Sequence, residues 1–88
     1  MNMKEGFFNY LSENYPEAVL LEGLNDGIVG VDTDGHVVYS YNKCCELIMK
    51  NNGISMEEAR EWVDFNTIKA IPYMGENKPV MMYDLEDF

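Results

Sequence analysis

The sequence predicts an α+β fold, in which a small antiparallel sheet, made of a central β-hairpin and a C-terminal strand, packs with three to four short helices. Helical spacing of apolar residues, a β-branched region around an Asp-Gly pair at 34–35, and a short apolar run after Pro79 indicate these elements. The 88 residues, of which 47% are hydrophobic, suffice for one acidic domain over residues 1–88 and are too few for two cores.

The N-terminal region predicts two short helices. Apolar residues recur at helical spacing over residues 3–11, and Pro16 predicts that this helix stops near Asn14, because the residue before a proline is biased away from the α region. Pro16 also suits the first position of a second helix, which residues 25–27 would end. The apolar residues of this second helix are Leu20, Leu21 and Leu24.

A β-hairpin is predicted over residues 28–41, centred on the Asp-Gly pair at 34–35. Aspartate and glycine tolerate the positive φ angles of a type I′ turn, whose twist matches that of the flanking strands. A two-residue turn of this kind pairs Val31 with Val38. One face of the hairpin then holds Ile28, Val37, Tyr39 and Tyr41, and the other holds Val29, Val31 and Val38.

Two further helices are expected after the hairpin. Asn42 caps the first, which runs to Lys50 and ends at the left-handed stop offered by residues 51–53. Ser55 and Glu58 have capping-box spacing, so they begin the second helix. Its buried residues are expected to be Met56, Ala59 and Val63.

The last part of the chain gives weaker signals. Residues 67–74 fit either a strand or an irregular, partly helical connection, whereas residues 75–78 predict a turn. Residues 79–83 predict an edge strand, because a proline at its start removes no donor from the ladder. Residues 84–88 are expected to be a frayed acidic tail.

The net charge excludes some partners and favours others. Sixteen acidic residues against six Lys and Arg give −10, which repels nucleic acid and anionic membranes and attracts a protein partner with a basic surface. An exposed strand edge also favours a homodimer through residues 79–83. The alternative for the acidic residues is a solvated face without a partner. The predicted partner-binding residues are Glu46, Glu57, Glu58, Glu61, Asp64, Val80 and Met82.

No catalytic or metal-binding constellation is predicted. Residues 32–35 look like part of a calcium loop, but the register puts Gly30 and Tyr41 at the first and twelfth ligand positions, where neither can serve. His36 and the cysteine pair at 44–45 supply three zinc ligands where a structural site needs four. We therefore expect a non-enzymatic protein without cofactor or metal.

Part of the chain resembles the opening hairpin and helix of PAS sensor domains. This resemblance implies a small-molecule-binding or sensory module, which is kept as the alternative function. The matching residues are Asp26-Gly27-Ile28, Val31-Asp32, Asp34-Gly35, Val37-Val38-Tyr39 and Asn42.

Most of the chain is similar to a widespread family of small uncharacterised proteins of phages and prokaryotes. This resemblance implies a phage or mobile-element origin and transfers no catalytic residue. It is carried by residues 17–24, 38–41, 43–49, 55–59 and 64–66, by Gly75-Glu76 and by residues 78–80.

Together, charge and resemblance predict a protein-binding module that acts through its acidic surface. The expected target is a host defence or nucleic-acid-processing complex, so the chain would be a phage-encoded inhibitor, for example an anti-CRISPR protein or a DNA mimic. The sequence has no basic segment followed by a long apolar run and no stretch near the ~20 apolar residues that span a bilayer. A cytoplasmic location, in the host if phage-encoded, is therefore expected.

Overall fold

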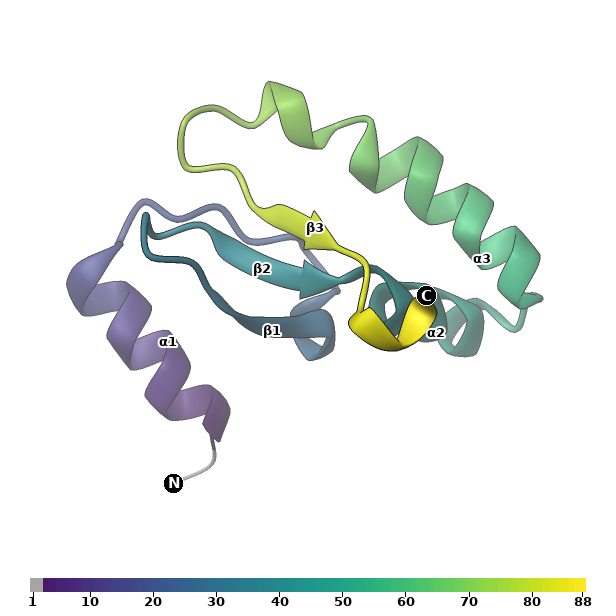
Figure 1. Ribbon diagram of the computed structural model, residues 1–88, viewed down its shortest axis with the longest axis horizontal. Helices are drawn as coiled ribbons and strands as arrows, with labels where there is room; N and C mark the ends of the chain where they lie inside the picture. Colours follow the sequence, from purple (N-terminus) through teal and green to yellow (C-terminus); the bar gives the residue numbers. More distant parts are fainter. Residues whose placement is uncertain (1–2) are drawn as a thin grey trace.

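The computed structural model describes residues 3–88, with side chains from residue 4 onward, and shows a small α+β fold (Figure 1). A three-stranded sheet in the order β1-β2-β3 has α1 at one end, while α2 and α3 lie toward the other (Figure 1). The main elements are α1 (Met3–Asn14), β1 (Ile28–Val31), β2 (Val37–Ser40), α2 (Tyr41–Asn52), α3 (Met56–Val63) and β3 (Val80–Met82). Within residues 3–88 no helix has the length and apolar character that crossing a membrane requires.

The sheet is mixed, so the prediction of an antiparallel sheet is wrong for its third strand. β1 and β2 are antiparallel, whereas β3 runs parallel to β2, with Val80 opposite Val38 and Met82 opposite Ser40. The physical reason is the connection: α2 and α3 form a crossover that returns the chain to the start of β2 before β3 begins. β1 and β3 are the two edges of the sheet.

The hairpin has a different turn from the predicted one. The Gly35 N–H donates to the Asp32 carbonyl (3.1 Å) and the Asp32 N–H donates to the His36 carbonyl (2.9 Å), which encloses a three-residue loop at 33–35. Only Gly35 has positive φ in this loop (+90°), so a type I′ turn is absent. The register moves by one residue, and Val31 pairs with Val37 instead of Val38.

Residues 15–24 do not form the helix predicted from Pro16. This segment, called the arm below, makes backbone bonds to distant parts of the chain instead of a helical ladder. The Leu21 N–H donates to the Tyr39 hydroxyl (2.7 Å), and the Val19 N–H donates to the Asn77 carbonyl (3.1 Å). Of the three predicted apolar residues, Leu21 and Leu24 are nevertheless buried, whereas Leu20 is 42% exposed. The arm therefore contributes to the core in a non-helical conformation.

The two central helices are present as predicted, with one change of cap. Ser40, not Asn42, caps α2: its backbone is extended and its Oγ accepts from the Lys43 N–H (3.2 Å). Gly53 ends α2 in the left-handed conformation, with φ of 63°. The capping box between Ser55 and Glu58 is confirmed at the start of α3, and a π-helical turn at Asp64–Ile68 continues beyond it.

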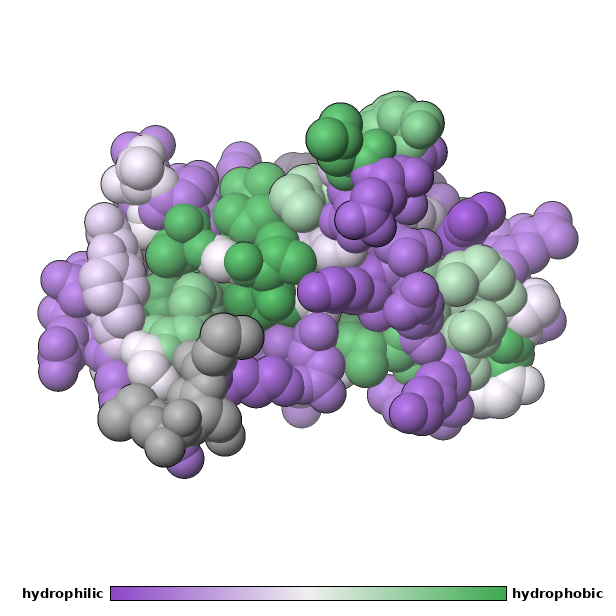
Figure 2. All heavy atoms as spheres, turned by 60° about the horizontal axis from the view of Figure 1, so that its bottom comes forward, coloured by the Kyte–Doolittle hydropathy of each residue, from purple (hydrophilic) through white to green (hydrophobic). Residues whose placement is uncertain are grey.

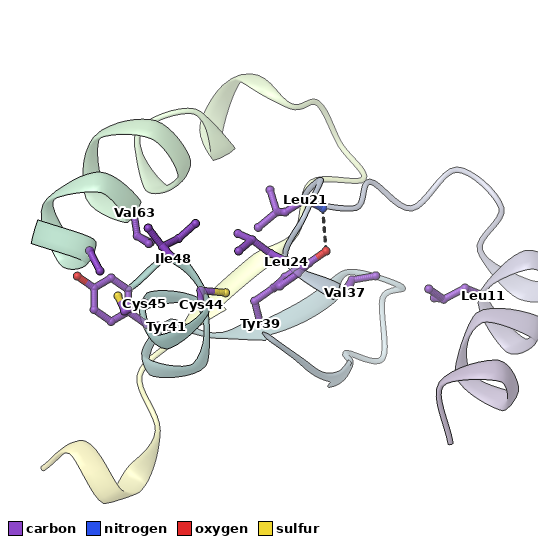
Figure 3. Close-up of a cluster of buried hydrophobic side chains, with 11 residues drawn as sticks. Leu11, Leu21, Leu24, Val37, Tyr39, Tyr41, Cys44, Cys45, Ile48 and Val63 are labelled. Carbon is purple, nitrogen blue, oxygen red and sulfur yellow. Dashed lines mark hydrogen bonds between the residues drawn. The ribbon is translucent and has the colours of Figure 1, made fainter. Parts of the chain in front are cut away.

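The core lies between the sheet, the arm and the two central helices (Figure 3). Tyr39 is fully buried at its centre, and its hydroxyl points to the backbone of the arm (Figure 3). The buried residues of the core are Leu11, Leu21, Leu24, Val37, Tyr39, Tyr41, Cys44, Cys45, Ile48, Ala59 and Val63. The outer side of α3 and the edge strands β1 and β3 therefore have side chains that lie outside the buried core.

The C-terminal residues, expected as a frayed tail, form an ordered turn. A 3-10 helix spans Leu85–Asp87 and has a capping box between Asp84 and Asp87. The Ser40 hydroxyl donates to Asp84 Oδ2 (3.0 Å), which ties this turn to the start of α2. We call residues 83–88 the C-terminal turn.

Candidate functional site

α3 presents carboxylates on the side that does not pack on the core. Ala59 and Val63 are fully buried, so the helix faces inward along that stripe. Glu57 and Glu61 are exposed and one turn apart, and Asp64 follows less than a turn later, which places the three on one side of the helix. Neither Glu57 nor Glu61 forms an ion pair with any residue from 4 to 88.

Glu58 has a different role from its acidic neighbours. Its Oε1 accepts from the Ser55 hydroxyl (3.1 Å), and its backbone N–H donates to that same Oγ (3.1 Å). Helical spacing puts it on the flank of α3 between Glu61 and Trp62, about one turn before both. Its carboxylate is therefore committed to the start of α3, although sequence reasoning placed it with the partner-binding residues.

Asp64 and Glu46 are two of the charges that act on the buried Cys45 thiol. The Tyr41 hydroxyl donates to Asp64 Oδ1 (2.8 Å). Burial raises the pKa of the Cys45 thiol; a hydrogen bond with Tyr41 and the charge of Arg60 oppose this rise, while the charges of Asp64 and Glu46 add to it. Glu46 of α2 thus belongs to the same electrostatic neighbourhood as the end of α3. We call Glu46, Glu57, Glu61 and Asp64 the acidic side.

The predicted apolar contact residues lie on a separate element. Val80 is 39% exposed and Met82 is half-buried, both on the edge strand β3. Alternation along the strand directs the two away from the core, against which Met81 packs. The predicted site is therefore two groups of residues, one on helices and one on a sheet edge.

An aromatic cleft of about 380 Å³ borders the acidic side. The rings of Tyr41 and Tyr83 pack edge to face with their centroids 5.0 Å apart, and the rings of Tyr83 and Phe88 do so with their centroids 6.3 Å apart. Sequence reasoning did not find this cleft, since no local signal joins α2, α3 and the C-terminal turn. It is lined by Tyr41, Asn42, Arg60, Tyr83, Asp87 and Phe88.

A second hollow, called the apolar groove below, lies between α1 and β1 and has a volume of about 420 Å³. Figure 2 shows apolar residues gathered over these two elements. Lys4 at its rim forms an ion pair with Asp26. The apolar lining comes from Phe7, Phe8, Ile28 and Val29.

His36, Cys44 and Cys45, which were weighed as metal ligands from the sequence, have partners within the fold: His36 contacts the backbone at Lys78, and the two cysteines lie in the core. The His36 ring Nδ1 lies 2.8 Å from the Lys78 carbonyl oxygen. Cys44 and Cys45 are fully buried, and burial raises the pKa of Cys44 to about 12, which keeps it a thiol at neutral pH. Across residues 4–88 no three His, Cys, Asp or Glu side chains are grouped to hold a metal ion.

No family model, curated protein or solved structure matches the chain.

Proposed function

We propose that the chain is a non-enzymatic protein-binding module whose acidic side docks on a basic surface. The observation that carries this proposal is the exposure of Glu57 and Glu61, one turn apart on a capped helix and without ion pairs to residues 4–88. A partner's lysines and arginines can reach these carboxylates without breaking an internal ion pair. The capping box holds the helix in shape before binding, which lowers the entropy lost on docking.

The partner that fits best is the nucleic-acid-binding groove of a host defence or nucleic-acid-processing complex, met in the host cytoplasm. Such a groove is lined with cations that neutralise phosphates, and a compact body of charge −10 offers carboxylates in their place. The resemblance to small phage proteins supports the same role of inhibitor. Attraction of this kind speeds association and weakens as salt screens the charges.

Affinity capture from host cells tests the proposal. The wild-type chain is expected to retain a nucleic-acid-binding protein at low salt and to release it at high salt, and DNA should compete for the same protein. Glu57→Lys with Glu61→Lys should abolish the capture. The matched control is Glu13→Lys with Glu22→Lys, which changes the net charge equally at two exposed residues elsewhere.

The control separates a specific surface from a general charge effect. If both double variants lose the partner equally, net charge alone drives capture and the acidic side is not the contact. Failure of the wild-type chain to capture any nucleic-acid-binding protein at low salt would remove the inhibitor role. Circular dichroism of each variant checks that the fold is intact.

Small-molecule binding is the second candidate function, and the aromatic cleft favours it. Its volume of about 380 Å³ falls within the range of ligand sites, and its rings offer stacking surfaces beside the guanidinium of Arg60. A ligand there should raise the melting temperature of the wild-type chain but not that of Tyr83→Ala. Absence of any shift across a broad metabolite panel would count against this function.

A further inference from the structure

The apolar groove is open at a sheet edge. Val29 of β1 is 42% exposed, and open space lies above Gly30, where an added Cβ would meet no atom within 4 Å. Phe7 and Phe8 of α1 form the opposite wall. Lys43 at the rim forms no ion pair with residues 4–88, so a cation stands beside an apolar surface.

The C-terminal turn has the complementary character. Leu85 and Phe88 are 88% and 90% exposed, so this ordered turn presents two large apolar side chains to solvent. Glu86 adds an exposed carboxylate between them. The capping box of Asp84 and Asp87 holds the turn in shape, so little conformational entropy is lost when it docks.

Groove and turn lie on the same face of the molecule. Figure 2 shows one apolar area over α1 and β1 and another at the C-terminal turn, with polar residues between them. The start of α2 separates the two: Asn42 lines the aromatic cleft beside the turn, and Lys43 lines the groove. A two-fold axis through this face can therefore bring each turn of a pair to the other's groove.

We propose that two copies of this chain associate through this face, with Leu85 and Phe88 of each copy in the apolar groove of the other and Glu86 near the other's Lys43. The charge complementarity is local: the ion pair of Lys4 with Asp26 leaves Lys43 as the cation at the groove rim without an ion pair among residues 4–88, and the turn carries the exposed carboxylate of Glu86 on a chain of net charge −10. This interface is reciprocal and closed, so it yields a dimer and no longer assembly. It uses neither β3 nor the acidic side and does not rest on the proposed function.

Sedimentation equilibrium of the whole chain tests the dimer. The wild-type chain is expected to dimerise, and Leu85→Ser with Phe88→Ser should raise the dissociation constant about tenfold or more, since central apolar contacts dominate interface energies. Val29→Ser should act in the same direction from the groove side. Tyr73→Ser is the control, because Tyr73 is an equally exposed aromatic residue outside both patches.

Charge exchange supplies a second, independent measurement. Lys43→Glu alone and Glu86→Lys alone should each weaken the dimer, and the two together should restore it. Mixing the Leu85/Phe88 variant with the Val29 variant should give a heterodimer that keeps one intact groove and turn contact. A monomeric wild-type chain at millimolar concentration overturns the proposal, as does a dimer that none of these changes weakens.

Discussion

The arm at residues 15–24 contacts three distant parts of the chain, whereas α2 and α3 supply their own caps. The Tyr15 ring packs against Gly35 of the hairpin loop. The Val19 N–H donates a hydrogen bond to the Asn77 carbonyl, and the Leu21 N–H donates one to the Tyr39 hydroxyl. Ser40, Gly53 and Ser55, in contrast, start or stop helices that contain them or adjoin them. Both regions carry helical spacing and a proline or polar start signal, yet only one of them is helical.

The difference shows when local preference decides a conformation. A helix is marginal in isolation, so tertiary contacts override its propensity wherever they bury more surface or satisfy more backbone groups. The arm gains the burial of Leu21 and Leu24 without helical hydrogen bonds, because the Tyr39 hydroxyl and the Asn77 carbonyl accept from its backbone. α2 and α3 meet no such competitor.

Gly35→Ala should have the largest effect, because it breaks the arm and the hairpin together. A Cβ at Gly35 would lie 2.2 Å from the Tyr15 ring, and the residue has φ of +90°, which alanine rarely adopts. Displacing the ring and adopting this φ together should cost about 2–4 kcal/mol of unfolding free energy. Urea denaturation followed by circular dichroism measures the loss.

Gly75→Ala is the matched control for that change. Gly75 has nearly the same φ, +88°, but open space around it, so alanine there meets the backbone penalty alone. A loss of about 1 kcal/mol is expected. Equal losses at the two positions would contradict the tight packing of Tyr15 on the hairpin loop.

Tyr39→Phe should have the next largest effect and should act through the arm. It removes the hydroxyl that accepts from the Leu21 N–H and leaves that donor buried without a partner, which typically costs about 1–3 kcal/mol. Amide exchange at Leu21 should accelerate more than exchange in α3. Tyr73→Phe, at a fully exposed ring, should change stability by less than about 0.5 kcal/mol.

Ser55→Ala probes the region that depends on local signals, and its effect should be smaller. The Ser55 hydroxyl caps α3 and bonds Glu58, and loss of such a cap costs about 1 kcal/mol. The fluorescence of Trp62 reports the helix directly. Ser12→Ala, on the exposed side of α1, should be neutral or slightly stabilising because alanine is the better helix former. If Ser55→Ala leaves stability unchanged, α3 is held by packing and not by its cap.

The parts of the fold that could be predicted are those with local causes. The hairpin, the stop at Gly53, the capping box at Ser55 and the edge strand after Pro79 each depend on neighbours in the sequence. The direction of β3 and the shape of the arm depend on contacts between segments far apart in the chain. No pattern within either segment contains that information.

The candidate site divides in the same way. The spacing of Glu57 and Glu61 on one helix places them on one exposed side, so the acidic side was largely predictable. The aromatic cleft and the apolar groove were not, because each joins elements that are separated in the sequence. The C-terminal turn that completes the cleft was expected as a frayed tail, although Asp84 and Asp87 have the spacing of the capping box that orders it.

Asp32→Asn should have the smallest effect of these changes. It tests the hairpin loop, which lies in the sequence between the arm and α2. The backbone N–H of His36, followed by that of Asp34, donates to Asp32 Oδ1 (2.9 Å each) and holds the pKa of this carboxyl below its ordinary value. A group whose pKa is lower in the folded state stabilises the protein above the unfolded pKa of about 4, and that contribution is lost as pH falls through the folded pKa.

Asparagine keeps the acceptor oxygen but carries no charge. The wild-type chain should therefore be more stable than Asp32→Asn at pH 7, and the difference should shrink as the pH falls toward 2. Paired urea denaturations at the two pH values, both away from the isoelectric point near 4.2, measure it. A difference of the same size at both pH values would mean that the charge of Asp32 contributes nothing to the loop.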